Sequence, residues 1–71
     1  MPNNTYNIIE IVGVSEDSIS HAVRNALKKA SQTLRHIEWF KVTGVRGQVK
    51  NNSEPVYQVA ITLGFRLEDH S

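Results

Sequence analysis

The segment VYQVAITLGFRLE, residues 56–68, decides the fold that we expect for this chain. Large apolar side chains alternate in it, without a break, with side chains that are polar or small. The apolar set comprises Tyr57, Val59, Ile61, Leu63, Phe65 and Leu67. A sustained period of two predicts a β-strand with one face on a hydrophobic core and the other face away from it.

A second strand is predicted near the N-terminus, over about residues 5–12, where TYNIIEIVG is rich in tyrosine and isoleucine and ends at Gly13. Its apolar residues fall on both faces, with Ile9 and Ile11 on one, and Tyr6, Ile8 and Val12 on the other. Only Glu10 interrupts the second set. A strand that is apolar on both sides is expected to be covered on both sides.

A third strand is predicted for IEWFKVTGVRGQVK, residues 37–50. Phe40 and Val42 share one face, which we assign to the core, and Trp39 shares the other face with Lys41 and Thr43.

A turn is predicted between this strand and strand 56–68. The composition of NNSEP, residues 51–55, predicts a turn, so the two flanking strands form a hairpin. Gly44 and Gly47 are candidates for a β-bulge or for a close backbone approach.

A helix is predicted for VSEDSISHAVRNALKKASQTLRH, residues 14–36. Ser15 is the expected N-cap, and Glu16 and Asp17 suit the positive end of the helix dipole. Apolar residues follow steps of three and four and form one stripe that comprises Ile19, Ala22, Val23, Ala26, Leu27, Ala30 and Leu34.

The order strand, helix, strand, strand predicts the topology. The helical crossover returns strand 37–50 parallel in direction to strand 5–12, and strand 56–68, the third in chain order, runs opposite to both. Placing the third strand in the centre gives the order 1-3-2 and makes every neighbouring pair antiparallel. We therefore expect a two-layer α+β fold, β-α-β-β, in which a three-stranded antiparallel sheet packs on one helix, as a single domain over residues 1–71.

A chain of this length is expected to be only marginally stable as a monomer. A domain of 71 residues buries a modest fraction of its surface, and the absence of cysteine excludes disulfides and thiolate metal sites. The histidines, His21, His36 and His70, show no ligand spacing, so we predict no metal and expect oligomerisation to stabilise the fold. A net charge of +1 gives no basic footprint for nucleic acid. No signal segment or membrane span is predicted, and a cytoplasmic protein is the simplest interpretation.

The face away from the helix raises the question of function, because it carries the single tryptophan. An exposed indole there predicts contact with another subunit, with a ligand, or with both. Trp39 offers a stacking plane, and the amide of Gln58 offers a donor and an acceptor that suit the edge of a planar heterocycle. From the pattern alone, such a tryptophan is more often an interface or core aromatic than a cofactor platform, and such a glutamine is more often a solvated or cross-strand polar residue. Because no nucleophile elbow, metal motif or phosphate-binding loop occurs, we do not expect an enzyme.

The segments EWFKVTGVRG and YQVAITLGFRLED, together with IEIVGVS and AVRNALKKASQTL, resemble the dodecin family of small flavin-binding proteins. The resemblance runs without insertion over about residues 6–69. It implies a hollow homo-dodecamer in which flavins sit in pairs at subunit interfaces, sandwiched between symmetry-related tryptophans. The implied function is storage and photoprotection of flavin without turnover.

The resemblance also implies roles for particular residues. Trp39 would stack on the flavin, the amide of Gln58 would meet the polar edge of the ring, and Glu38 would contact the ribityl chain. Arg46 would contribute to the ligand site or to the adjoining interface, whereas Arg66 is not assigned to ligand rather than assembly.

Ligand identity is the less specific part of the resemblance. Bacterial dodecins prefer FMN, riboflavin and FAD are the other flavins to consider, and some members carry coenzyme A at another interface. Asn4, Asn7 and Gln48 depart from the usual family residues, which leaves the choice between riboflavin and FMN open. A coenzyme A carrier and a purely structural shell protein are the alternative functions.

Overall fold

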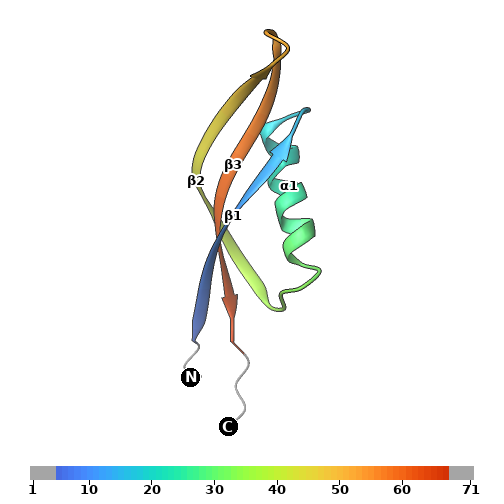
Figure 1. Cartoon of the computed structure of the whole chain (residues 1–71). Helices are drawn as coiled ribbons and strands as arrows, with labels where there is room; N and C mark the ends of the chain where they lie inside the picture. The colour runs from blue at the N-terminus through green and yellow to red at the C-terminus, as the bar shows by residue number, and fades with distance from the viewer. Residues whose placement is uncertain (1–4, 68–71) are drawn as a thin grey trace.

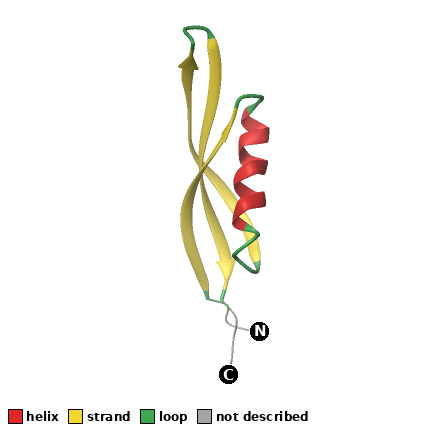
Figure 2. Ribbon diagram, turned by 45° about the vertical axis from the view of Figure 1, so that its right-hand side comes forward, coloured by secondary structure: helices red, strands yellow, loops and turns green. Residues whose placement is uncertain are grey.

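The computed structural model describes residues 5–67. Its elements are β1 (Tyr6–Ser15), α1 (Ile19–Ala30), β2 (Ile37–Lys50) and β3 (Glu54–Arg66). β3 lies between β1 and β2 and is antiparallel to both, and α1 packs on one side of the sheet (Figures 1 and 2). The predicted two-layer α+β fold and the strand order 1-3-2 are therefore confirmed.

The core lies between β3 and α1. Val59, Ile61 and Leu63 of β3 are completely buried, which confirms the middle of the predicted alternating apolar set as core. Tyr57 and Phe65 are only partly buried, and Leu67, beyond the end of β3, is 43% exposed. The helix contributes only small buried side chains, Ala22, Ala26 and Ala30. Small residues let a helix approach a sheet closely, so the core is thin.

β1 is longer than predicted at its C-terminal end. Gly13 was expected to end the strand, but Val14 and Ser15 continue the ladder by pairing with residues of β3. Gly13 has a different role: a Cβ atom at this position would overlap the carbonyl oxygen of Ala22. The glycine therefore allows α1 to approach β1, and it does not break the strand.

The predicted N-cap was wrong, because β1 extends to Ser15 and the helix begins later. Ser18 is the N-cap, and its side chain accepts a hydrogen bond from the backbone N–H of His21 at 3.0 Å. Glu16 and Asp17 precede the helix, and its first turn contains no acidic residue. Ser15 is buried and accepts hydrogen bonds from the next turn, including one from the N–H of Asp17 at 2.9 Å.

α1 ends at Ala30, before the predicted end. The hydroxyl of Ser31 donates to the carbonyl of Lys28 at 2.9 Å, and short turns follow. Side-chain hydroxyls that bond to nearby carbonyls compete with helix continuation. Leu34 is thus not helical, although it still packs against the core as the apolar stripe predicted.

The hairpin between β2 and β3 turns at the predicted place, but the turn covers only residues 51–53, because Glu54 and Pro55 already belong to β3. Lys50 pairs with Glu54, and Asn51 and Asn52 between them have φ values of 52° and 68°. Asparagine tolerates this left-handed region better than most residues, so the NNSEP composition serves the turn geometry.

α1 packs on β1 and β3 and leaves most of β2 uncovered (Figure 1). Phe40 and Val42 lie on the helix side of the sheet as predicted, but they do not join the core, since they are 47% and 43% exposed. The molecule is elongated, with extents of 55 × 20 × 14 Å and a radius of gyration of 14.9 Å. A compact chain of this length would have a radius of gyration of about 11 Å.

Within residues 5–67 there is no helix long and apolar enough to cross a membrane.

Candidate functional site

A β-bulge in β2 decides which residues share a face with Trp39. The register against β3 shifts between Val42 and Gly44, so Thr43 is an extra residue. Trp39 and Arg46 are an odd number of positions apart and would lie on opposite faces of a regular strand. The extra residue reverses the alternation and brings Arg46 to the face of Trp39. The prediction of a bulge near Gly44 is confirmed.

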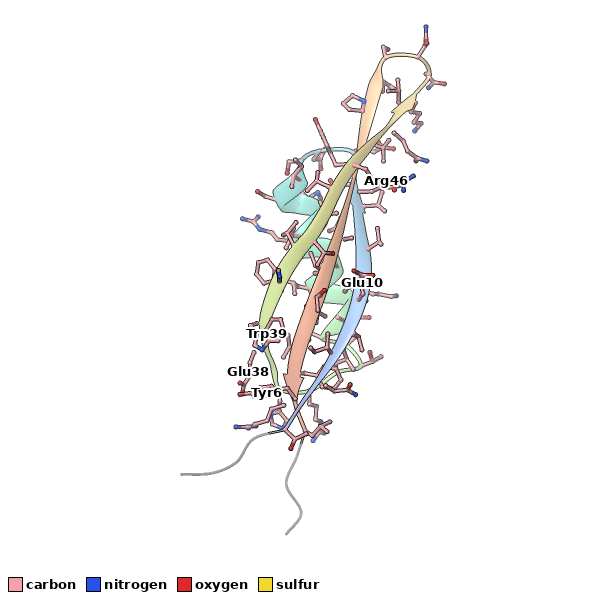
Figure 3. The ribbon with its side chains drawn as sticks, turned by 90° about the vertical axis from the view of Figure 1, so that its left-hand side faces the viewer. Tyr6, Glu10, Glu38, Trp39 and Arg46 are labelled. Carbon is pink, nitrogen blue, oxygen red and sulfur yellow. The ribbon has the colours of Figure 1, made fainter. Side chains whose placement is uncertain are left out.

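We call the sheet surface away from α1 the open face. Figure 3 views the molecule from this side, with Tyr6, Glu38 and Trp39 towards one end and Arg46 towards the other. Across the three strands it comprises Tyr6, Ile8, Glu10, Val12 and Val14, then Gln58, Ala60, Thr62, Gly64 and Arg66, then Trp39, Lys41, Thr43, Gly44 and Arg46. It mixes exposed apolar side chains with charged ones.

Trp39 lies on the open face and not beneath the helix. It pairs with Gly64 of β3, and its indole occupies the space that a side chain at Gly64 would fill. The residue is 41% exposed. Part of an aromatic ring is therefore supported by the sheet while the remainder is open to another molecule.

Glu38 is held at the same end of the open face. It lies at a second register shift of β2, between Ile37 and Trp39. The hydroxyl of Tyr6 donates to Glu38 Oε1 at 3.0 Å, and Arg66 Nη1 lies 3.8 Å from Glu38 Oε2. This cluster ties the outer strands together across β3, and Arg66 belongs to it.

Gln58 and Arg46 are paired neighbours at the other end of the open face. They line a shallow pocket of about 230 Å³. The remaining lining residues are Val12, Gly44, Val45 and Ala60. An amide and a guanidinium thus stand over an apolar floor, an arrangement that can bind the polar edge or the anionic group of an aromatic ligand.

The structure does not bring Trp39 and Gln58 together within one chain. Trp39 is level with Gly64, six positions along β3 from Gln58. At about 3.3 Å per residue this separation is roughly 20 Å, longer than a fused three-ring heterocycle. Within one protomer the two residues therefore lie at opposite ends of the open face.

Glu10 and Thr43 lie on the open face between these two ends and were not among the predicted site residues. The hydroxyl of Thr43 is 3.1 Å from Glu10 Oε2 and 3.2 Å from the carbonyl oxygen of Ala60. The sequence already distinguished Glu10, because it is the one charged residue on the face of β1 that carries Tyr6, Ile8 and Val12. Its carboxylate gives the open face a central hydrogen-bond acceptor.

Serine, histidine and aspartate do meet at the start of α1, but not as a catalytic relay. Ser15 Oγ is 2.9 Å and Asp17 Oδ2 is 3.1 Å from the same ring nitrogen, Nδ1 of His21. A nucleophilic triad uses opposite ring nitrogens for these two contacts. Within residues 5–67, no three histidine, cysteine, aspartate or glutamate side chains gather in a group that could hold a metal ion. Asn4 and His70 lie outside the described residues.

The dodecin family model matches residues 5–68. A dodecin of Thermus thermophilus is 42% identical over 64 residues, which cover 90% of this chain and 93% of the relative. The structure of a dodecin from Streptomyces coelicolor superposes with a TM-score of 0.90 at 52% identity, covering 97% of this chain and 99% of that one. A dodecin from Streptomyces davaonensis gives a TM-score of 0.91 at 41% identity over 96% and 100% of the chains.

These similarities extend over nearly the whole chain and agree with the strand order, the helix position and the resemblance seen in the sequence. Dodecins are oligomeric, bind flavins as storage proteins, and are not enzymes. The chain therefore belongs to the dodecin family.

Proposed function

We propose that this chain assembles into a hollow dodecamer that binds flavin, preferentially FMN, in pairs between subunits. It stores the cofactor and protects it from light without turning it over. We place this role in the cytoplasm. Flavin binding in the family supports the ligand class.

The single observation that carries the proposal is the position of Trp39 on the open face. The indole rests on the backbone at Gly64 and is 41% exposed, although burying aromatic surface is favourable. Two such faces brought together by symmetry would present two indoles to a pair of stacked isoalloxazine rings. Offset stacking of aromatic rings adds to the gain from burial.

The separation of Trp39 from Gln58 supports a site shared between subunits. In this proposal the indole comes from one protomer, and the amide that binds the ring edge comes from another. Arg46, the paired neighbour of Gln58, supplies a positive charge to the site. Its guanidinium favours FMN in this proposal by binding the phosphate at the end of the ribityl chain, the group that riboflavin lacks. Glu38 offers its carboxylate to the ribityl hydroxyls as well as to Tyr6.

The shape of the protomer supports assembly. An elongated chain with a thin core exposes apolar residues on both sides of the sheet. Phe40, Val42 and Val45 lie on the helix side, and Ile8 and Val12 lie on the open face. Burial of both sets requires neighbours, because one helix covers only part of one side.

Photoprotection follows from the chemistry of the stack. An electron-rich indole in contact with an excited isoalloxazine ring can donate an electron and take it back quickly. The absorbed energy then becomes heat before the flavin can react with oxygen. Such a site needs a stacking partner and exclusion of solvent, and it needs no acid, base or nucleophile.

Titration of the purified protein with FMN and with riboflavin tests the proposal, with flavin fluorescence as the readout. We expect quenching of both flavins, tighter binding of FMN, and a light-scattering mass that corresponds to twelve chains. Mass spectrometry of ligand released from the native particle identifies what it carries. Unquenched fluorescence at micromolar protein, or release of coenzyme A alone, would contradict flavin storage.

A further inference from the structure

We propose that Gly64 is a positioning residue for flavin stacking: its missing side chain lets the indole of Trp39 lie against the backbone of β3, and this sets the plane on which the ring stacks. The inference rests on the proposed function and adds a residue to its site that touches the indole, not the ligand.

The contact is sterically specific. A Cβ atom added at Gly64 would overlap three atoms of the Trp39 indole, namely Cε2, Cζ2 and Nε1. Gly64 is buried even though it belongs to the open face, where α1 provides no cover. The indole therefore occupies the volume over Gly64 and is supported by the central strand.

The backbone gives no other reason for a glycine at this position. Among the described residues no glycine has a positive φ, so the conformation of Gly64 is open to any L-residue. Gly64 lies inside the central strand and pairs with Ile8 on one side and Trp39 on the other. Glycine weakens a strand interior and commonly marks a place where another group approaches closely.

A side chain at this position would change the direction of the indole. Because the central strand is hydrogen-bonded on both edges, the backbone cannot yield easily, and the indole must rotate away from it towards solvent. An indole that is rotated away from the sheet loses its contact with the backbone of β3, and the orientation of the ring that stacks on the ligand changes. Misplacement of a binding group by about 1 Å is enough to cost a large factor in a geometry-dependent interaction.

The test compares Gly64→Ala with Gly47→Ala. Gly47 lies on the same sheet but on the helix side, and a Cβ atom there would meet only the carbonyl oxygen of Val56 at 3.7 Å. Trp39 is the only tryptophan of the chain, so fluorescence excited at a wavelength that tyrosine does not absorb reports on it alone. In flavin-free protein, Gly64→Ala should shift the emission to the red and increase quenching by acrylamide, and Gly47→Ala should leave both as in the wild type.

Flavin titration is the second readout. Gly64→Ala should weaken FMN binding by at least about tenfold, whereas Gly47→Ala should change it less than about twofold. Wild-type emission together with wild-type affinity in Gly64→Ala would overturn the inference. If the wild-type protein quenches no flavin while Gly64→Ala still shifts the emission, the proposed function fails and the placement of the indole by Gly64 stands.

A double variant distinguishes the overlap with the indole from a general destabilisation of the strand by Gly64→Ala. Adding Gly64→Ala to Trp39→Ala removes the overlap, because the indole is absent. Thermal unfolding should show that Gly64→Ala lowers the midpoint in the wild-type background and does not lower it in the Trp39→Ala background. A loss of equal size in both backgrounds would show that the glycine serves the backbone, and it would overturn the inference.

Discussion

Replacing Trp39 with alanine should weaken flavin binding roughly 50-fold or more and leave the assembled particle intact. The indole is 41% exposed in the protomer. For a side chain of about 250 Å², this leaves roughly 100 Å² for contact with a stacked ring. At about 25 cal/mol per Å², burial of that area contributes roughly 2.5 kcal/mol, which corresponds to a factor of about 60 in affinity.

The assay is a fluorescence titration of flavin at fixed ionic strength, with the particle mass measured by light scattering on the same samples. Trp39→Phe serves as the matched variant, because it keeps an aromatic plane over Gly64 but offers less area. Its affinity should fall between those of the wild type and Trp39→Ala. The reasoning is refuted if Trp39→Ala binds flavin like the wild type, or if it dissociates into monomers, since the indole would then serve packing between subunits.

Three further changes test the fold and the site. Gly13→Ala should destabilise the protein by about 1–3 kcal/mol, because the new Cβ would overlap the carbonyl oxygen of Ala22; a wild-type unfolding midpoint would contradict the close packing of α1 on β1. Gln58→Leu keeps the size of the side chain but removes the amide, so flavin affinity should fall by about 1–3 kcal/mol in titrations, and an unchanged affinity would remove Gln58 from the site. Lys50→Met removes the exposed ion pair with Glu16 at 3.1 Å, and denaturant unfolding should show a loss below about 1 kcal/mol that disappears at high salt.

The faces of the strands could be predicted from the sequence with no knowledge of the fold. The alternation of apolar and polar residues in β3 predicted that Val59, Ile61 and Leu63 lie in the core. The same alternation of side chains in β2 predicted that Trp39 lies on the opposite side of the sheet from Phe40. Both results depend only on the geometry of an extended chain, in which neighbouring side chains point to opposite faces.

The ends of the helix and of β1 were predicted less well. Ser15 has a side chain suited to an N-cap, but it is the last residue of β1 and pairs with β3. Ser18, three residues later, is the N-cap instead, and serine is a preferred residue at that position. Local propensity identified the residue type, and strand pairing decided which serine performs the role.

The sequence by itself determined the strand order, the side of the sheet on which the tryptophan lies, and the family, because these depend on local alternation and on motifs read along the chain. Only the tertiary structure decided that Thr43 bulges and turns Arg46 to the open face, that Trp39 and Gln58 lie at opposite ends of it, and that the indole rests on Gly64. Register and bulges are set by hydrogen bonds between strands, and a close contact depends on two segments remote in the chain, so neither is encoded in the spacing of residues on one strand.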